Sequence, residues 1–274
     1  MILGVLTVHD DVDVLEQTLA WHLNHGVSRL GVVLHQTTPE ALAILAKFEA
    51  EIAAKLPVAT PSYMQKEWLA IVRSQMVKTL QLTDQDWFVH FDADERWSGL
   101  DCLQRMPAQV WAVQTQPWSN YLPHSPDEFC FAKVTRRDIK PVMDYEPLVK
   151  VAIRACQPVT TTQGNHEAVL VHGKPLPKHR QRVSSIYLDH FPIRTLPQLR
   201  RKTCQAANAL QYRTDPKDPT GWHWASWLER HRQDPELALV RMFQPLCDAQ
   251  AGRALTPEEQ VRLQGYSLST QVVL

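Results

Sequence analysis

Short apolar runs alternate with runs of helical periodicity through the first hundred residues, and this alternation constrains the fold more than any other feature of the chain. Ile2–Val8 has the length of a buried strand, and Val12–Gly26 repeats its apolar residues at spacings of three and four. A second strand-like run, Leu30–Leu34, precedes a predicted helix that begins at Pro39 and extends to about Lys55. Strands separated by helices of this length predict βαβ units and a mainly parallel sheet.

The pattern continues with a short third strand at Pro57–Ala59, a helix over Gln65–Leu80 and a strand over Asp86–Asp92. Further short strands are predicted at Val110–Gln114, Val149–Ile153 and Ala168–Val171, with a long loop over Trp118–Phe131. From Leu196 onward the patterns are helical. We therefore predict an α/β domain over residues 1–195 and a helical C-terminal extension over residues 196–274.

Composition excludes several classes of protein. The 274 residues are 44% hydrophobic, which suffices for a sizeable core, and 29 basic residues balance 29 acidic ones. A net charge of zero provides no bulk attraction to nucleic acid or to anionic membranes. The five cysteines are scattered and show no C-x-x-C spacing, which argues against a zinc module or a disulfide framework.

The sequence also predicts the cellular location of the protein. Its first residues lack the basic start and the long apolar stretch of a secretory signal, and no window approaches the roughly 20 apolar residues of a membrane span. Scattered cysteines suit a reducing compartment. We predict a cytoplasmic location, with work at the inner membrane face left open.

One predicted strand ends in three acids, in the run Asp86–Glu95. In extended backbone, residues two apart point to the same side, so Asp92 and Asp94 are expected to face one way. Two hard oxygen ligands suit Mg²⁺ or Mn²⁺, and such a cation suits a diphosphate substrate. His9–Asp11 and His35 also follow predicted strands, so all these residues are expected to converge at one edge of the sheet.

Four segments, in this order, resemble the bacterial family-2-like glycosyltransferases with a GT-A fold. Leu15–Val27 resembles the family's helix that ends in H-x-x-x-G-V, and Asp86–Glu95 resembles its D-W…D-x-D-E metal motif. Gly164–His166 resembles a short motif of the acceptor half, and Asp189–Thr195 with Lys202 resembles the H-[YF]-P-x-R-[ST]…K segment. The likeness covers roughly residues 1–205.

The resemblance implies a GT-A fold and transfer of a sugar, with inversion, from a nucleotide-diphosphate sugar to the hydroxyl of a glycan or another acceptor. The donor is a UDP-sugar by default. The chain departs from the family at His9–Asp11 and at His35–Thr38, the places that normally hold the base and ribose. At the first of these places, His9 and Asp11 are assigned to the nucleotide.

The resemblance also implies roles for single residues. Asp94 is the main metal ligand, and Asp92 reaches the ribose, or the metal through water. His190 completes the metal sphere, and Arg194 and Lys202 hold phosphate oxygens.

A base near the acceptor hydroxyl is also required. His166 and Glu167 are the candidates, with Asp144 and Glu146 as rivals, and Glu95 is expected to support the metal ligands from behind.

Several motifs have simpler readings. His22 and His25 are predicted as helix surface and helix cap, and the tryptophans of Gly221–Trp227 as core packing. Ser98–Asp101 resembles a capping box before a short helix that Pro107 ends.

Two other functions stay open at this point: a metal-dependent phosphohydrolase or nucleotidyltransferase, and a non-catalytic GT-A-like protein that binds a glycan.

Overall fold

A computed structural model describes residues 1–60, 64–134, 139–140, 149–211, 229, 232–259 and 271–272. The chain forms two compact units. Unit 1 comprises Met1–Thr60, Met64–Trp118 and Leu148–Asp189, and unit 2 comprises Pro61–Tyr63, Ser119–Pro147 and His190–Leu274. The predicted division at residues 195 and 196 stays a prediction, although a helix does begin at Leu196.

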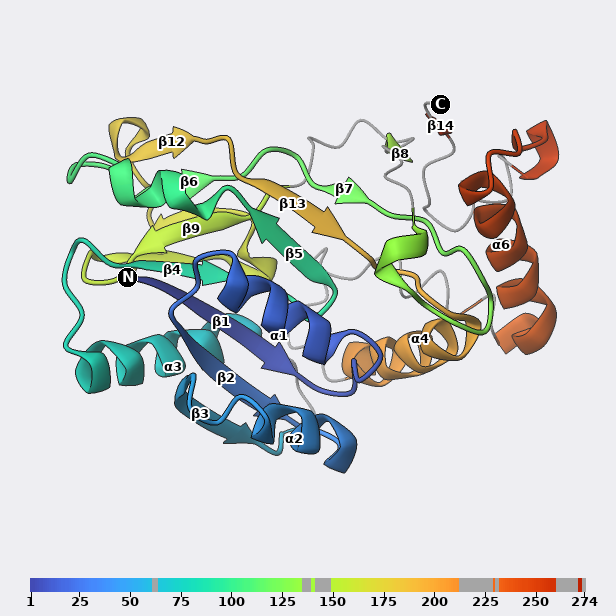
Figure 1. Ribbon diagram of the computed structural model, residues 1–274, viewed down its shortest axis with the longest axis horizontal. Helices are drawn as coiled ribbons and strands as arrows, with labels where there is room; N and C mark the ends of the chain where they lie inside the picture. The colour runs from blue at the N-terminus through green and yellow to red at the C-terminus, as the bar shows by residue number, and fades with distance from the viewer. Residues whose placement is uncertain are drawn as a thin grey trace. The chain divides into compact units, whose positions relative to one another are not determined.

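A seven-stranded sheet forms the centre of unit 1 (Figure 1). Its strands are β1 (Ile2–Val8), β2 (Arg29–His35), β3 (Ile52–Val58), β4 (Trp87–His90), β6 (Ala112–Gln114), β9 (Val151–Arg154) and β12 (Gln181–Val183). They neighbour one another in the order β12-β6-β9-β4-β1-β2-β3. Pairings β1–β2, β1–β4, β2–β3 and β6–β12 are parallel, and only β9 is antiparallel to its neighbours. The mixed α/β fold with a largely parallel sheet is thus confirmed.

Helices cover both faces of this sheet. The helices of unit 1 are α1 (Leu15–Asn24), α2 (Pro39–Ala46) and α3 (Gln65–Leu80). The smaller elements are β5 (Glu95–Ser98), β10 (Val159–Thr161), β11 (Ala168–Leu170), β13 (Tyr187–His190, whose last residue belongs to unit 2) and the 3-10 helices η1 (Leu100–Arg105), η3 (Gln163–Asn165) and η4 (Lys178–Arg180). Strands β10 and β11 form an antiparallel hairpin.

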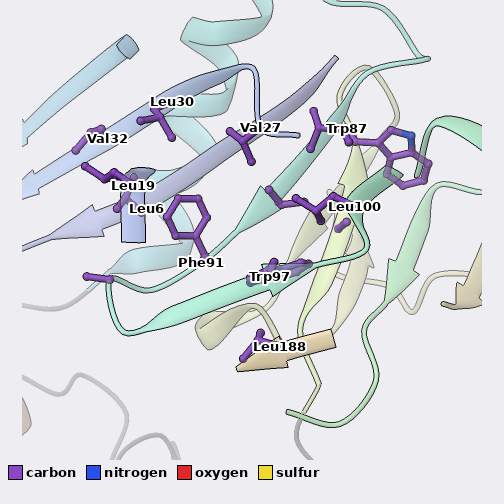
Figure 2. Packing of buried hydrophobic residues seen from close by; sticks show 14 of the residues in the cluster. Leu6, Leu19, Val27, Leu30, Val32, Trp87, Phe91, Trp97, Leu100 and Leu188 are labelled. Carbon is purple, nitrogen blue, oxygen red and sulfur yellow. The ribbon is translucent and has the colours of Figure 1, made fainter. Parts of the chain in front are cut away.

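Alternation along β1 divides the core between the two faces. Leu6 and Val8 point into the cluster that receives Leu19 of α1, whereas Leu3 and Val5 point into the cluster that receives α3. Figure 2 shows part of the first cluster, in which Phe91 lies beside Leu6 and Leu19. Trp97 of β5 and Leu188 of β13 belong to the same cluster, which thus joins the sheet to these two strands.

Close packing of α3 on the sheet depends on a glycine in β2. A Cβ added at Gly31 would clash with Val72 and Met76 of α3. Both of these side chains are completely buried, so the helix has no room to retreat without opening the core. This contact fixes α3, whose first residues reach the candidate site.

The predicted helix over 39–55 is too long. Thr38 does cap α2, since its Oγ1 accepts from the Ala41 N–H at 3.3 Å, but the helix ends at Ala46. The following segment forms β3, paired with β2 from Ile52 to Val58. Pairing of this segment with β2 overrides its local helical pattern. The spacing of apolar residues in the sequence contains no information on hydrogen bonds to a distant strand.

The predicted capping box at Ser98 is also wrong. Ser98 is the last residue of β5, a strand that the sequence did not predict, and the residue before η1 is Gly99. Gly99 has φ of 81°, a left-handed conformation that glycine adopts at little cost. The turn therefore depends on glycine and not on a serine cap.

His22 lies in the core and not on the helix surface. Its ring stacks on Phe91 with centroids 3.7 Å apart, Nδ1 donates to the Thr18 carbonyl at 2.9 Å, and Nε2 accepts from the Trp97 N–H at 3.3 Å. Only a neutral ring can make both bonds, and burial lowers the pKa of His22 to about 3. His25 is exposed and does stand at the C-terminal cap of α1.

Unit 2 is described by itself. Its elements are β7 (Ser119–Asn120), η2 (Phe131–Lys133), β8 (Ile139–Lys140), α4 (Leu196–Gln211), α6 (Pro235–Gln250) and β14 (Gln271–Val272), with β8 and β14 paired antiparallel. The predicted helix at 196–212 is confirmed by α4. Within the described residues of the chain, no helix combines the length and the apolar character needed to cross a membrane.

Acid should destabilise the fold through His22. Its folded pKa of about 3 lies below the ordinary 6.5, so the unfolded state binds the extra proton. The full contribution is present above pH 6.5 and is lost as the pH falls, by up to about 1.4 kcal/mol per pH unit. The free energy of unfolding can be measured with urea at a series of pH values. Between pH 6 and pH 4 it should depend on pH less steeply in His22→Gln than in the wild type, by a difference that corresponds to about one proton.

His25→Gln provides the matched control on the same helix, and its slope should equal that of the wild type. An unchanged slope in His22→Gln would refute the assignment of a buried neutral ring.

Candidate functional site

The acidic run lies at the carboxyl end of β4, in a turn. The strand ends at His90, and the Glu95 N–H donates to the Asp92 carbonyl at 3.0 Å, which closes a turn over Asp92–Glu95, here called the acidic turn. The expectation that Asp92 and Asp94 share an extended backbone is therefore wrong. The geometry of the turn therefore sets the positions of the two carboxylates, and the alternation of side chains along a strand does not.

A buried lysine lies against the acidic turn. Lys150 Nζ is 2.9 Å from Asp92 Oδ2 and 3.1 Å from Glu95 Oε1, and its side chain is 1% exposed. Glu95 is equally buried, and its Oε2 accepts the Asp92 N–H at 3.0 Å. Asp92 is the accessible member, with 37% of its side chain exposed. Glu95 thus holds the backbone of Asp92, and Lys150 contacts both carboxylates. The predicted role of Glu95 behind a metal ligand stays a prediction.

The charges in this cluster interact strongly. Burial raises the pKa of Glu95 to about 8, the Lys150 charge opposes this rise, and the negative charges of Asp92 and Asp94 add to it. For Lys150, burial is outweighed by the charges of Asp92 and Glu95, so its pKa lies above the ordinary value. Lys150 therefore keeps its positive charge, and Glu95 takes up a proton more readily than an exposed carboxyl group does. We call Asp92, Asp94, Glu95 and Lys150 the strand-end cluster.

The reversed direction of β9 brings Lys150 to this place. Because β9 is antiparallel to β4, its first residues lie beside the last residues of β4. Lys150 directly precedes β9, and Thr115, which follows β6, exchanges two hydrogen bonds with it: Thr115 N–H to Lys150 O at 3.0 Å, and Lys150 N–H to Thr115 Oγ1 at 3.1 Å.

Sequence reasoning missed Lys150, although a signal was present. A lysine inside a run expected to be a buried strand needs a partner, because an unpaired buried charge is costly.

Helix α3 supplies a further contact that the sequence did not reveal. Gln65, in its first turn, donates from Nε2 to Asp92 Oδ1 at 3.0 Å. The next residue, Lys66, donates its N–H to Gln163 Oε1 at 3.2 Å, so η3 caps the start of α3. The first turn of α3 is thus linked both to the acidic turn and to the loop that carries His166.

The sequence Gly-Asn-His forms a tight turn that presents the histidine. Gly164 and Asn165 both have positive φ, 77° and 61°, and the buried Asn165 side chain accepts from Thr161 Oγ1 at 2.7 Å. A Cβ at Gly164 would lie 2.8 Å from Cδ2 and 2.9 Å from Nε2 of His166. Glycine is therefore required twice, for its backbone conformation and for the space that the imidazole occupies.

The imidazole of His166 is held in one tautomer. Nδ1 donates to the Val149 carbonyl at 2.8 Å, which leaves Nε2 as the acceptor nitrogen. Burial lowers the pKa of His166, the charge of Lys150 adds to this, and the Val149 bond and the charge of Asp92 oppose it. A neutral imidazole beside the strand-end cluster has the form of a general base.

Glu167, the other candidate base, is exposed. Its backbone N–H and carbonyl both bond the Thr162 hydroxyl, and among the described residues no hydrogen bond or ion pair joins its carboxylate to the strand-end cluster. The rival residues Asp144 and Glu146 lie outside the described residues, as does Gly221–Trp227.

The predicted nucleotide residues lie at the ends of β1 and β2. His9 Nδ1 donates to the His35 carbonyl at 2.8 Å, and His35 Nε2 donates to the Thr60 carbonyl at 2.9 Å. The His35 ring lies 4.6 Å from that of Trp68. Asp11 accepts the Leu15 N–H at 2.9 Å through its backbone carbonyl and so begins α1. The convergence of His9 and His35 at one sheet edge is thus observed, and their role stays a prediction.

Three predicted residues belong to unit 2. His190 Nδ1 donates to Asn120 Oδ1 at 2.7 Å, and Lys202 Nζ donates to the Pro192 carbonyl at 3.3 Å. Arg194 is completely buried, and its Nη1 donates to the Phe191 carbonyl at 3.1 Å. The roles of His190 as a metal ligand and of Arg194 and Lys202 as phosphate contacts stay predictions.

The donor set fits a hard divalent cation with few protein ligands. Across the part of the chain that is described, no three His, Cys, Asp or Glu side chains gather as a metal site. Mg²⁺ is commonly held by one or two carboxylates, with water and substrate phosphates completing its octahedron. Asp92 and Asp94 are carboxylates of this kind: Asp92 is partly exposed, Asp94 is buried, and Lys150 engages Glu95.

Comparison with known proteins gives a likeness of fold at low sequence identity. No protein-family model matches the chain, and no curated protein matches it. Among solved structures, it is similar to S. aureus TarS, residues 1–349, with 10% identity and a TM-score of 0.38, over 97% of this chain and 89% of that one. A TM-score this low carries no functional argument, so the residues themselves must supply one.

Gly164→Ala should displace the His166 ring. The added methyl group occupies the place of the imidazole and also requires a strained positive φ, so unfolding should become easier by about 1–3 kcal/mol. Chemical unfolding measures this loss, and the NMR signal of the His166 imidazole should shift.

Gly173→Ala is the matched control, since it has a similar φ of 83° and no atom within 4 Å of the added Cβ. Equal losses in the two variants would show that crowding of His166 plays no part.

Proposed function

We propose that the protein transfers a sugar from a nucleotide-diphosphate sugar to an acceptor hydroxyl, with Mn²⁺ or Mg²⁺ bound at the acidic turn. The observation that supports this most is the pairing of two chemical groups at one sheet edge. Lys150 contacts the partly accessible carboxylate of Asp92, and the imidazole of His166 donates to the carbonyl of the preceding residue, Val149. The likeness of four sequence segments to family-2-like glycosyltransferases supports the same function.

The residues of the acidic turn prepare a place for the donor diphosphate. Gln65 and Lys150 engage the two oxygens of Asp92, and Glu95 closes the turn behind it. Asp94 and the accessible side of Asp92 would hold the cation. When bound, the cation supplies Lewis-acid stabilisation of the charge that develops on the departing diphosphate.

His166 is the better of the two candidate bases. Its Nε2 is set to accept a proton from the acceptor hydroxyl, because Nδ1 is committed to Val149. The lowered pKa keeps the ring neutral at pH 7, which is the form a base requires. Glu167 is exposed and lacks a described link to the cluster.

The first test combines cation and nucleotide. Mn²⁺ with UDP, GDP or TDP should raise the melting temperature by several degrees at about 100 times the dissociation constant, since ligands that bind the native state stabilise it. Asp94→Asn should lose most of this shift, measured from the ligand-free melting temperature of the variant itself. No shift with any of the three nucleotides would count against a nucleotide-sugar donor.

Product analysis separates this proposal from the other functions. Incubation with nucleotide sugars should yield nucleoside diphosphate together with a glycosylated acceptor. Release of phosphate or pyrophosphate without glycosylation would indicate a phosphohydrolase or a nucleotidyltransferase. Acceptor binding with no turnover across a donor panel would indicate a non-catalytic protein.

Substitution of each candidate base decides between them. His166→Ala should lower kcat by about 10²–10⁴-fold, the usual contribution of a general base, whereas Glu167→Gln should leave kcat within a factor of about two. Steady-state kinetics at saturating donor measures this, with melting temperatures as a check on folding. The reverse pattern would move the role of base to Glu167.

A further inference from the structure

We propose that Lys150 is a resident counter-cation that weakens and so sets the affinity of the acidic turn for a divalent cation. The inference rests on the cation site of the proposed function and goes beyond it, because it assigns control of that site to a residue outside the acidic motif. Its basis is geometric: one buried ammonium contacts both Asp92 and Glu95.

Lys150 and a divalent cation would draw on the same carboxylate. Lys150 Nζ is 2.9 Å from Asp92 Oδ2, and Gln65 Nε2 is 3.0 Å from Asp92 Oδ1. Both oxygens of Asp92 therefore already accept a hydrogen bond. A cation at Asp92 must share an oxygen with one of these donors, and repulsion from the nearby ammonium lowers its affinity.

The ammonium is held in place and does not move aside at low cost. The backbone of Lys150 is bonded in both directions to Thr115, and the side chain is 1% exposed. Leaving the cluster would place an unpaired charge in the core, which costs several kcal/mol per ion. Lys150 thus differs from a surface lysine, which water screens and which can turn away.

The contacts of Lys150 give the sign of the effect. Its ammonium lies 2.9 Å from Asp92 Oδ2 and 3.1 Å from Glu95 Oε1, so it repels a second cation that approaches Asp92. Removing the ammonium removes this repulsion. A lysine with a merely structural role would have the opposite effect, since a loosened turn binds a cation more weakly. Tightening of cation binding therefore distinguishes the two roles.

The experiment measures Mn²⁺ dissociation constants by electron paramagnetic resonance of free Mn²⁺, without nucleotide or acceptor. Lys150→Met should bind Mn²⁺ at least about tenfold more tightly than the wild type. Its metal-free melting temperature should fall, and Mn²⁺ should raise it by more than it raises that of the wild type. Lys150→Gln, which keeps hydrogen-bond donors in place of the charge, provides a second variant if Lys150→Met does not fold.

Two controls test whether the change in Mn²⁺ affinity comes from loss of positive charge and whether that charge must be at position 150. Lys150→Arg keeps the positive charge and should retain weak, wild-type binding. Lys47→Met removes one positive charge from an exposed ion pair with Glu16 and should also leave the Mn²⁺ dissociation constant unchanged.

The outcomes separate this inference from the proposed function. Mn²⁺ binding in both charge-removed variants that is no tighter than in the wild type would overturn the role of Lys150, whether or not the wild type binds. Binding by the variants and not by the wild type would support the role of Lys150 and contradict metal-dependent transfer. Tighter binding by variants of a wild type that also binds would support both.

Discussion

The ion contacts of Lys150 organise the carboxyl edge of the sheet. Without the ammonium, the buried Glu95 would lose the positive charge that lies 3.1 Å from its Oε1, and Asp92 would lose the donor to its Oδ2. With it, Asp92 is held by two donors and still presents 37% of its side chain to solvent. A buried charge pair of this kind contributes little net stability, but it specifies which side chain faces outward.

Topology explains why so many polar groups meet at this edge. Parallel strands end together, so residues after β1, β2 and β4 gather, and α3 begins at the same edge because it follows β3. The single reversed strand, β9, adds a residue from its beginning, Lys150. A purely parallel sheet would place that residue at the opposite edge.

The predictions from the sequence agree closely with the structure for elements that are determined by local sequence patterns. Helix α3 spans Gln65–Leu80 as its periodicity predicted, and Thr38 caps α2. The sequence-based predictions are wrong where contacts with residues distant in the sequence determine the local structure. Residues 52–55, predicted as the end of a helix, pair with β2, and His22, predicted on the helix surface, stacks on Phe91 in the core. Hydrogen bonds and stacking across the core outweigh the few tenths of a kcal/mol that separate local preferences.

The sequence by itself determined the mixed α/β class, the acid at the end of β4 and the Gly-Asn-His motif, because periodicity, residue chemistry and glycine's backbone freedom are local properties. Only the tertiary structure decided that Asp92–Glu95 is a turn and that Lys150 contacts it with a positive charge. It also decided that His166 bonds Val149, next to Lys150, whereas Glu167 is exposed. The physical reason is burial: a charge far away in sequence becomes a partner only when folding removes water from between the two groups.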